Sequence, residues 1–251
     1  NINFIDTAEM YPVNPISAET VGRSEEIIGR WISKNKTRRS DFILATKHSG
    51  KGLSHVRNGA PITKDTIQNA VEGSLKRLRT DYIDLYQFHW PNRGSYMFRQ
   101  NWKYDPSRQD KKSTLENMYE CLVTLQKQVD KGNIRYFGLS NESAWGTANW
   151  LKLSEQHNLP RVATIQNEYS LLCRLYDTDL AELSVNEGVG LMAFSPLAAG
   201  LLTGKYLDGK LPENSRKLVN QDLGGRDNSR SEMAVRSYLK IAQEFGLNPI
   251  H

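Results

Sequence analysis

The sequence predicts an α/β fold in which parallel strands and helices alternate to form a (β/α)8 TIM barrel. Six short apolar segments, each flanked by polar or turn residues, are typical of strands that are buried on both faces. Helical segments separate them, and the composition does not change along the 251 residues, which favours one domain over residues 1–251. A doubly wound sheet would usually place a glycine-rich phosphate turn after its first strand. The first strand is instead followed by Asp6-Thr-Ala-Glu-Met-Tyr11, so the barrel is favoured.

Hydrophobic periodicity places each element in chain order. The predicted strands are Ile2–Asp6, Phe42–Thr46, Ile83–Phe88, Ile134–Leu139, Val162–Ile165 and Gly190–Phe194. The predicted helices span about Glu19–Asn35, Lys64–Leu78, Ser113–Lys131, Ala144–His157, Asp177–Glu187 and Ser229–Phe245. Thr63 and Ser113 are expected to be helix N-caps, and Gly132 and Gly188 suit helix C-termini.

Three long loops interrupt this alternation: Ser49–Ile62, Pro91–Lys112 and Ser195–Asn228. The first two follow strands, on the side where a barrel builds its substrate pocket. The second is rich in aromatic and basic residues. Its length and position predict a pocket wall or lid, and a decorated surface loop is the alternative.

The two ends of the chain do not complete a barrel. A barrel of this type has eight strands and six are predicted, so two βα-units are missing or split between the ends. The chain also begins inside a strand pattern with Asn1 and stops after His251. We therefore expect it to be an internal piece of a longer protein.

Composition and charge exclude several classes of function. The hydrophobic fraction of 38% and charged fraction of 24% are typical of globular proteins. The net charge of +5 is spread without a basic stripe or reading motif, so no nucleic-acid partner is expected, and some positive charge is left for an anionic small ligand. The most apolar stretch, Val189–Leu202, is too short and interrupted to span a membrane. Two cysteines in different elements, Cys121 and Cys173, predict a reducing, cytoplasmic setting.

Residues able to move or hold a proton follow the ends of three strands. Asp6 and Tyr11 follow the first, Lys47 the second and His89 the third, and in a parallel barrel these ends converge on one mouth. A phenol has a pKa of about 10 and transfers protons poorly at neutral pH unless a neighbouring ammonium lowers that pKa. A carboxylate paired with the ammonium fixes its position, and a histidine can donate a hydrogen bond to an oxygen that gains charge. Each residue alone is weak evidence, but together they predict reduction of a carbonyl.

At this point the chain resembles the aldo-keto reductase superfamily along essentially its whole length. The matching segments occur in family order, and Met10-Tyr-Pro12 with the long loops is most similar to the bacterial Tas-type members. The segments are Phe4-Ile-Asp-Thr-Ala-Glu-Met-Tyr11, Ala45-Thr-Lys47, Gln87-Phe-His-Trp90, Gly132-Asn-Ile-Arg-Tyr-Phe-Gly-Leu-Ser-Asn141, Gln166-Asn-Glu-Tyr169 and Phe194-Ser-Pro-Leu-Ala-Ala-Gly-Leu-Leu-Thr-Gly-Lys205.

The resemblance implies four catalytic residues. Tyr11 would be the general acid, and Lys47 would lower the pKa of its phenol. Asp6 would pair with Lys47, and His89 would orient the carbonyl of a small-molecule substrate. The implied cofactor is NADP(H), and no metal site is implied.

The resemblance also implies residues that bind this cofactor. Ser140, Asn141 and Gln166 would hold the nicotinamide carboxamide, with Asp6 beside it. Phe194 takes the place of a ring that stacks on the nicotinamide, although a core phenylalanine ending a strand is a serious alternative. The pyrophosphate would contact Ser195, Leu197, Gly200 and Lys205. Arg216 would lie near the adenosine end, and an exposed, solvated arginine is an equal alternative there.

By the same resemblance the six predicted strands are strands 2 to 7 of the family's barrel. The first and last βα-units, including the segment that normally binds the adenosine 2′-phosphate, are expected to be absent from this chain. The preference for NADP over NAD is therefore implied by the family alone.

Three functions remain open from the sequence. An NADPH-dependent carbonyl reductase ranks first. A cofactor-binding regulatory subunit, similar to the β subunits of potassium channels, ranks second, because those subunits retain the same four residues. A catalytically idle fragment ranks third, and substrate and oligomeric state are not predicted.

Overall fold

The computed structural model describes residues 2–14 and 16–250 and divides the chain into two compact units. The first unit is Asn1–Gln166 with Leu183–Leu191, and the second is Asn167–Glu182 with Met192–His251. A single barrel domain over residues 1–251 stays a prediction.

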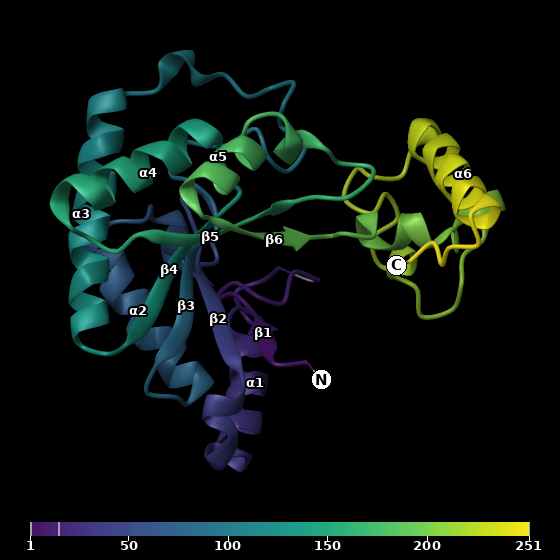
Figure 1. Ribbon diagram of the computed structural model, residues 1–251. Helices are drawn as coiled ribbons and strands as arrows, with labels where there is room; N and C mark the ends of the chain where they lie inside the picture. Colours follow the sequence, from purple (N-terminus) through teal and green to yellow (C-terminus); the bar gives the residue numbers. More distant parts are fainter. Residues whose placement is uncertain (1, 15, 251) are drawn as a thin grey trace. The chain divides into compact units, whose positions relative to one another are not determined.

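Six strands form one sheet whose order follows the chain: β1 (Phe4–Asp6), β2 (Ile43–His48), β3 (Ile83–Phe88), β4 (Ile134–Ser140), β5 (Val162–Glu168) and β6 (Gly190–Phe194). The pairings from β1 to β5 are all parallel, and the strands alternate with helices along the chain (Figure 1). A curled parallel sheet with this alternation is consistent with part of a (β/α)8 barrel, which confirms the predicted fold class.

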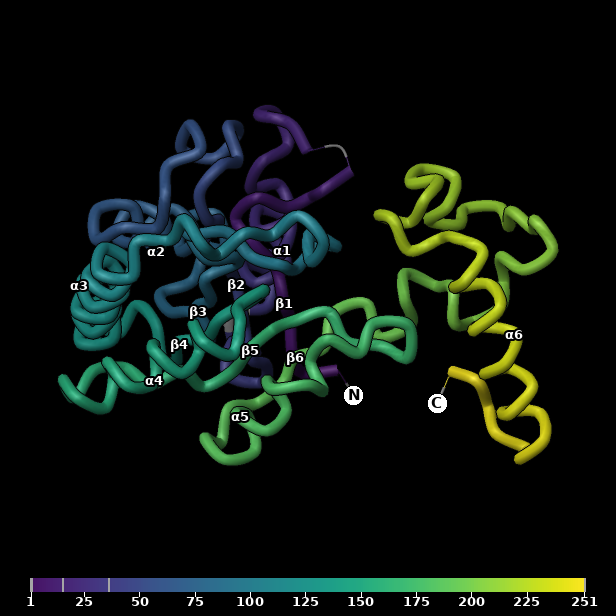
Figure 2. Tube along the Cα trace, turned by 90° about the horizontal axis from the view of Figure 1, so that it is seen from above, coloured from purple at the N-terminus to yellow at the C-terminus, as the bar shows by residue number. Residues whose placement is uncertain are grey.

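The helices are α1 (Arg23–Lys34), α2 (Lys64–Leu78), α3 (Lys111–Asp130), α4 (Ala144–His157), α5 (Leu180–Glu187) and α6 (Ser229–Glu244). Seen from above in Figure 2, α2, α3 and α4 lie around the outer side of the strands. The Thr63 side chain accepts a hydrogen bond from the Thr66 amide, which confirms the predicted N-cap of α2. Gly132 and Gly188 follow α3 and α5 with φ angles of 74° and 64°, the left-handed conformation expected after a helix end.

Several predicted boundaries were wrong. The Asp110 carboxylate, not Ser113, caps α3, because it accepts a hydrogen bond from the Ser113 amide. Helix α1 starts four residues later than predicted, at Arg23. Leu175–Asp177 is a separate 3-10 turn, so α5 starts at Leu180. Strand β5 continues three residues beyond the predicted end, to Glu168.

The core of the first unit fills the space between the sheet and its outer helices. Phe88, Phe137 and Trp150 form one aromatic cluster, with ring centroids 5.0 to 5.6 Å apart. The second unit has a small core of its own, made by Ala198, Leu201, Leu202, Tyr206, Leu223 and Val235. Across the described ranges we find no helix with the length and apolar character needed to cross a bilayer.

Candidate active site

The ends of β1 and β2 bring Asp6 and Lys47 together. Asp6 is aligned with Ala45 in the parallel register, so a side chain two residues further along β2 can reach the carboxylate. The Lys47 Nζ atom lies 2.6 Å from Asp6 Oδ2 and donates a second hydrogen bond, of 2.7 Å, to the Thr7 carbonyl. Gln87 donates to the other carboxylate oxygen over 3.2 Å.

Lys47 is fully buried at this point. Burial lowers the pKa of the ammonium, and the charge and hydrogen bond of Asp6 oppose that shift. The Lys47 side chain is therefore shielded from water, while the paired Asp6 side chain is 29% exposed.

Tyr11 and His89 lie beside this pair. The two rings meet edge to face with centroids 5.6 Å apart and an interplanar angle of 75°, and Lys47 Nζ is 5.5 Å from the centre of the Tyr11 ring. A hydrogen bond from the Tyr11 amide to the Ala8 carbonyl, 3.0 Å long, turns the chain after β1. The structure thus brings together all four residues that the sequence proposed as catalytic.

His89 is neutral in this environment. Burial lowers its pKa well below the usual range, and the nearby Lys47 charge adds to the shift. Its Nδ1 atom is buried without a hydrogen-bond partner among the described residues. A neutral imidazole has one N–H to donate, which suits a hydrogen bond to an uncharged carbonyl oxygen.

Ser140, Asn141 and Gln166 meet where β4 and β5 lie side by side. Ser140 Oγ donates to the Gln166 carbonyl over 2.8 Å, and the Asn141 amide nitrogen donates to the same oxygen over 3.0 Å. The side-chain nitrogen of Asn141 donates to the His89 carbonyl and to Ser140 Oγ, at 2.9 and 3.0 Å. This leaves Asn141 Oδ1 as a buried acceptor without a hydrogen-bond partner in the described chain, which fits the amide protons of a nicotinamide carboxamide.

A cavity of about 880 Å³ opens beside Tyr11 and His89. Its other walls come mainly from apolar side chains and from the two long loops that follow β2 and β3, as the sequence predicted. These lining residues are Met10, Val13, Ile16, Lys51, Gly52, Leu53, Trp90, Ser95, Phe98 and Gln100. A cavity with this lining can hold a small molecule with an apolar body.

The sequence did not predict a buried charged cluster between β1 and the loop after β2. Arg57 contacts both carboxylate oxygens of Glu9, and the Ser49 amide donates to Glu9 Oε1 over 2.5 Å. Burial raises the pKa of Glu9, but its hydrogen bond with Arg57 and the surrounding charges outweigh that effect and lower it. His48 lies beside the pair, and burial lowers its pKa to about 4. The cluster fastens the loop to the segment that carries Asp6 and Tyr11.

The remaining predicted cofactor residues lie in the second unit. Phe194 is half-buried at the end of β6. In the loop that follows, Ser195, Ala199 and Gly200 have φ angles of 53°, 58° and 100°, so the chain turns tightly there.

Lys205 folds back over this turn, since its Cε would lie 3.0 Å from a Cβ added to Gly200. Leu197 is half-buried, and Arg216 is exposed in a 3-10 turn. All of these residues lie within the second unit.

Comparison with known proteins agrees with this geometry. Residues 1–251 match the model of the Aldo/keto reductase family. The chain belongs to the aldo/keto reductase family. It is therefore an oxidoreductase of a family that generally binds NAD(P)H and acts on small-molecule carbonyl compounds.

Individual members of the family and related proteins are similar to this chain in sequence. Protein Tas of Escherichia coli (strain K12) is 41% identical over 251 residues, which cover 99% of this aldo/keto reductase and 71% of Tas. An aldo-keto reductase of Babesia bovis is 38% identical over 220 residues, covering 82% and 76% of the two chains. A probable voltage-gated potassium channel subunit beta of Arabidopsis thaliana is 33% identical over 256 aligned positions, which cover 98% of this chain and 67% of that protein.

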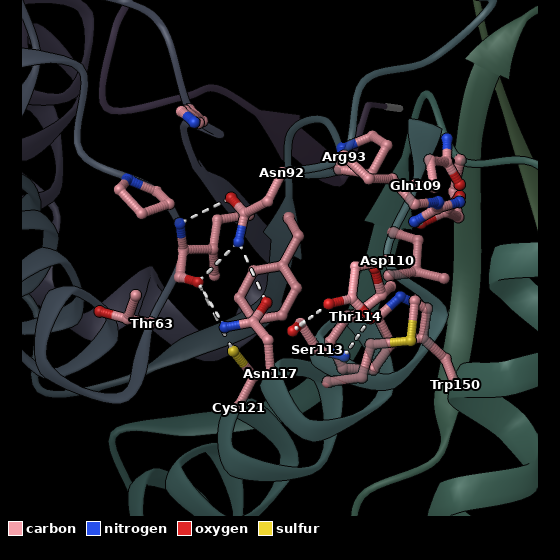
Figure 3. A pocket seen from close by; sticks show the side chains of 18 of the residues that line it. Thr63, Asn92, Arg93, Gln109, Asp110, Ser113, Thr114, Asn117, Cys121 and Trp150 are labelled. Carbon is pink, nitrogen blue, oxygen red and sulfur yellow. Dashed lines mark hydrogen bonds and ion pairs between the residues drawn. The ribbon is translucent and has the colours of Figure 1, made fainter. Parts of the chain in front are cut away.

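This aldo/keto reductase has a second cavity, of about 340 Å³, whose lining includes Phe88 of β3, Leu139 and Ser140 of β4 and residues of α3 (Figure 3). Asn92 and Asn117 line it and hydrogen-bond to each other over 3.1 Å and to the Ile62 backbone over 2.8 to 3.0 Å. Ser140 is the one predicted site residue among its described lining residues, and Lys51 lines both cavities. The group around Tyr11 faces the larger cavity.

Proposed function

We propose that this aldo/keto reductase uses NADPH to reduce the carbonyl group of aldehydes or ketones to an alcohol. The observation that carries the proposal is the buried Lys47–Asp6 pair beside Tyr11 and His89. A bound nicotinamide supplies a hydride to the carbonyl carbon.

The four side chains divide the remaining work. The Tyr11 hydroxyl gives its proton to the carbonyl oxygen, and the Lys47 ammonium stabilises the phenolate that is left. Asp6 holds the ammonium in place through the 2.6 Å contact. Neutral His89 donates a hydrogen bond that orients the carbonyl oxygen and stabilises the charge that develops on it.

The residues proposed to bind the cofactor follow from the family resemblance. Ser140, Asn141 and Gln166 would hold the nicotinamide carboxamide, with the free Asn141 Oδ1 as the acceptor. Asp6 would lie close to the nicotinamide ring. A stacking role for Phe194 is proposed from the family resemblance alone.

The tightly turned loop after β6 would receive the phosphates. Ser195, Leu197 and Gly200 allow close approach of the backbone, and Lys205 offers positive charge. Arg216 would lie near the adenosine end. NADPH is proposed over NADH from the family resemblance. A cytoplasmic site of action is proposed from the low cysteine content, two residues in 251, with Cys121 buried.

The test is the oxidation of NADPH with a panel of aromatic and aliphatic aldehydes, followed by the absorbance of the nicotinamide. We expect saturable oxidation of NADPH and one alcohol formed per NADPH consumed. Tight binding of NADPH without turnover on any aldehyde would contradict the proposal.

The potassium-channel relatives support a second candidate, a regulatory subunit that docks on a membrane protein. It predicts stoichiometric capture of a channel-type partner from solubilised membranes, with negligible turnover of aldehydes. The intact set of Asp6, Tyr11, Lys47 and His89 makes the enzyme the first choice.

A further inference from the structure

We propose that Lys51 forms an anion-binding subsite in the substrate cavity, so that the enzyme prefers apolar aldehydes or ketones that also carry a carboxylate. This inference rests on the proposed carbonyl reduction and names the class of substrate within it. It starts from the distribution of charge around the cavity.

Lys51 is the one permanently charged side chain among the described residues that line the cavity. It is exposed and forms no ion pair with any residue in the described part of the chain. The other titratable groups of the lining, Tyr11 and His89, belong to the proposed catalytic group. The cavity therefore presents one cation without a counter-ion inside a largely apolar wall.

Carboxylates close to the cavity are already neutralised. Asp6 is paired with Lys47 at 2.6 Å. Glu9 is buried and paired with Arg57. An anion that enters the cavity would thus meet the Lys51 ammonium without repulsion from an unpaired carboxylate of these two residues.

The backbone of Lys51 is fixed on the wall of the cavity. Trp90 Nε1 donates a hydrogen bond of 3.1 Å to the Lys51 carbonyl, and the Gly52 amide donates one of 3.0 Å to Gly59. A Cβ added to Gly50 would lie 2.4 Å from both the Trp90 ring and the Trp90 carbonyl. This contact seats the segment directly against Trp90, so the lysine side chain starts from a defined position.

The apolar part of the lining determines the rest of the ligand. Trp90, Phe98 and Leu53 provide flat and aliphatic surfaces around a space of about 880 Å³, which suits an aromatic or long aliphatic body. A carboxylate on that body would gain the attraction of the exposed Lys51 ammonium, which added salt screens. At longer range, the attraction between the Lys51 ammonium and the substrate carboxylate would also speed their encounter.

The experiment compares kcat/KM for two aldehydes of nearly equal shape, 4-formylbenzoate and 4-formylbenzamide, together with their 3-formyl isomers. We expect the wild-type enzyme to favour the carboxylates by about fivefold at low salt, as for a partly exposed ion pair. The preference should shrink as salt is added. It should disappear in Lys51→Gln and invert in Lys51→Glu.

Lys76→Gln is the matched control, because Lys76 is an exposed lysine in the last turn of α2 and lines neither cavity. It should keep the wild-type preference.

Four outcomes would overturn the inference. Failure to reduce either compound would reject the carbonyl reduction itself. Equal kcat/KM for the carboxylates and carboxamides, or a preference that survives Lys51→Gln, would reject the subsite alone. Weaker NADPH binding in Lys51→Gln, with both substrates affected equally, would assign the ammonium to the cofactor instead.

Discussion

Lys47 and His48 are neighbours in β2, and both are completely buried. The Lys47 ammonium reaches Asp6, whereas His48 Nε2 contacts the Thr66 hydroxyl of α2 at 3.2 Å. Adjacent residues of a strand point to opposite faces, so one side chain serves the site and the other serves the packing of a helix. Burial disfavours the charged form of each. The Asp6 carboxylate at 2.6 Å opposes this for Lys47, and the Glu9 carboxylate at 3.9 Å opposes it for His48, whose other charged neighbour is Arg57 at 3.1 Å.

The neutral state of His48 predicts a loss of stability in acid. Its pKa is about 4 in the folded chain against 6.5 in the unfolded chain, so the unfolded chain binds more protons between these values. Stability is therefore complete above about pH 6.5 and falls as the pH drops toward 4, by up to about 3 kcal/mol. Urea unfolding measured across this range should show the decline.

A His48→Gln variant should have a flatter pH dependence over the same range. His157→Gln, at the end of α4, is the control and should keep the wild-type slope. An unchanged slope in His48→Gln would assign the acid sensitivity to other groups.

Residue types at strand ends were enough to predict the group of Asp6, Tyr11, Lys47 and His89, because a parallel barrel forces those ends together. Glu9 could not be assigned a role in this way. Its partner Arg57 is 48 residues away in a loop without periodic pattern, and pairing between a strand end and a loop leaves no regular spacing in the sequence.

Among the elements, α1 and α2 approach each other closely at Gly29. A Cβ added to Gly29 would lie 2.1 Å from the Arg77 carbonyl and 2.8 Å from the Leu78 carbonyl carbon, both backbone atoms at the end of α2. Backbone atoms cannot move aside as a side chain can. The contact therefore requires the absence of a side chain.

Gly29→Ala should destabilise the protein by about 1–3 kcal/mol through overpacking between the two helices. Gly73→Ala is a matched comparison inside α2, where the added Cβ would meet only the flexible end of Arg77, at 3.1 Å. It should be neutral or stabilise by up to about 1 kcal/mol, since alanine favours helix. Urea unfolding of both variants measures the two changes in stability. Equal changes would show that helix propensity, and not the close backbone contact at Gly29, determines the effect of the substitution.

The six strands and six α-helices were each predicted with the correct type, because apolar runs and helical periodicity are set by burial on the two sides of the sheet, whereas the 3-10 helices were not predicted. Boundaries were less predictable. Asp110 and Ser113 are both good capping residues, and only the observed hydrogen bond decides that the aspartate starts α3. The predicted start of α1 at Glu19 instead falls in turns held by Ser17 and Thr20.

For the whole molecule, binding of NADPH should raise the stability of the folded chain. A ligand at a concentration of about 100 Kd adds about 2.7 kcal/mol, which raises Tm by roughly 5–10 °C for a chain of this size. Thermal unfolding with and without NADPH measures this shift.

Asn141→Ala should reduce the shift, because it removes the acceptor proposed for the carboxamide. Asn149→Ala, which removes a half-buried side chain of α4 that donates to the Trp145 carbonyl and lines neither cavity, should leave the shift intact. A full shift in Asn141→Ala would contradict the assignment of Asn141.

The most direct measurement is the single-turnover rate of NADPH oxidation by Tyr11→Phe with an aldehyde, alongside NADPH affinity measured by nicotinamide fluorescence. We predict that the rate falls at least about a hundredfold, as expected for loss of a general acid, while NADPH affinity stays within about twofold because the variant lacks only one oxygen. Tyr119→Phe, in α3, should behave as wild type. Retention of the wild-type rate in Tyr11→Phe would contradict the proposed mechanism.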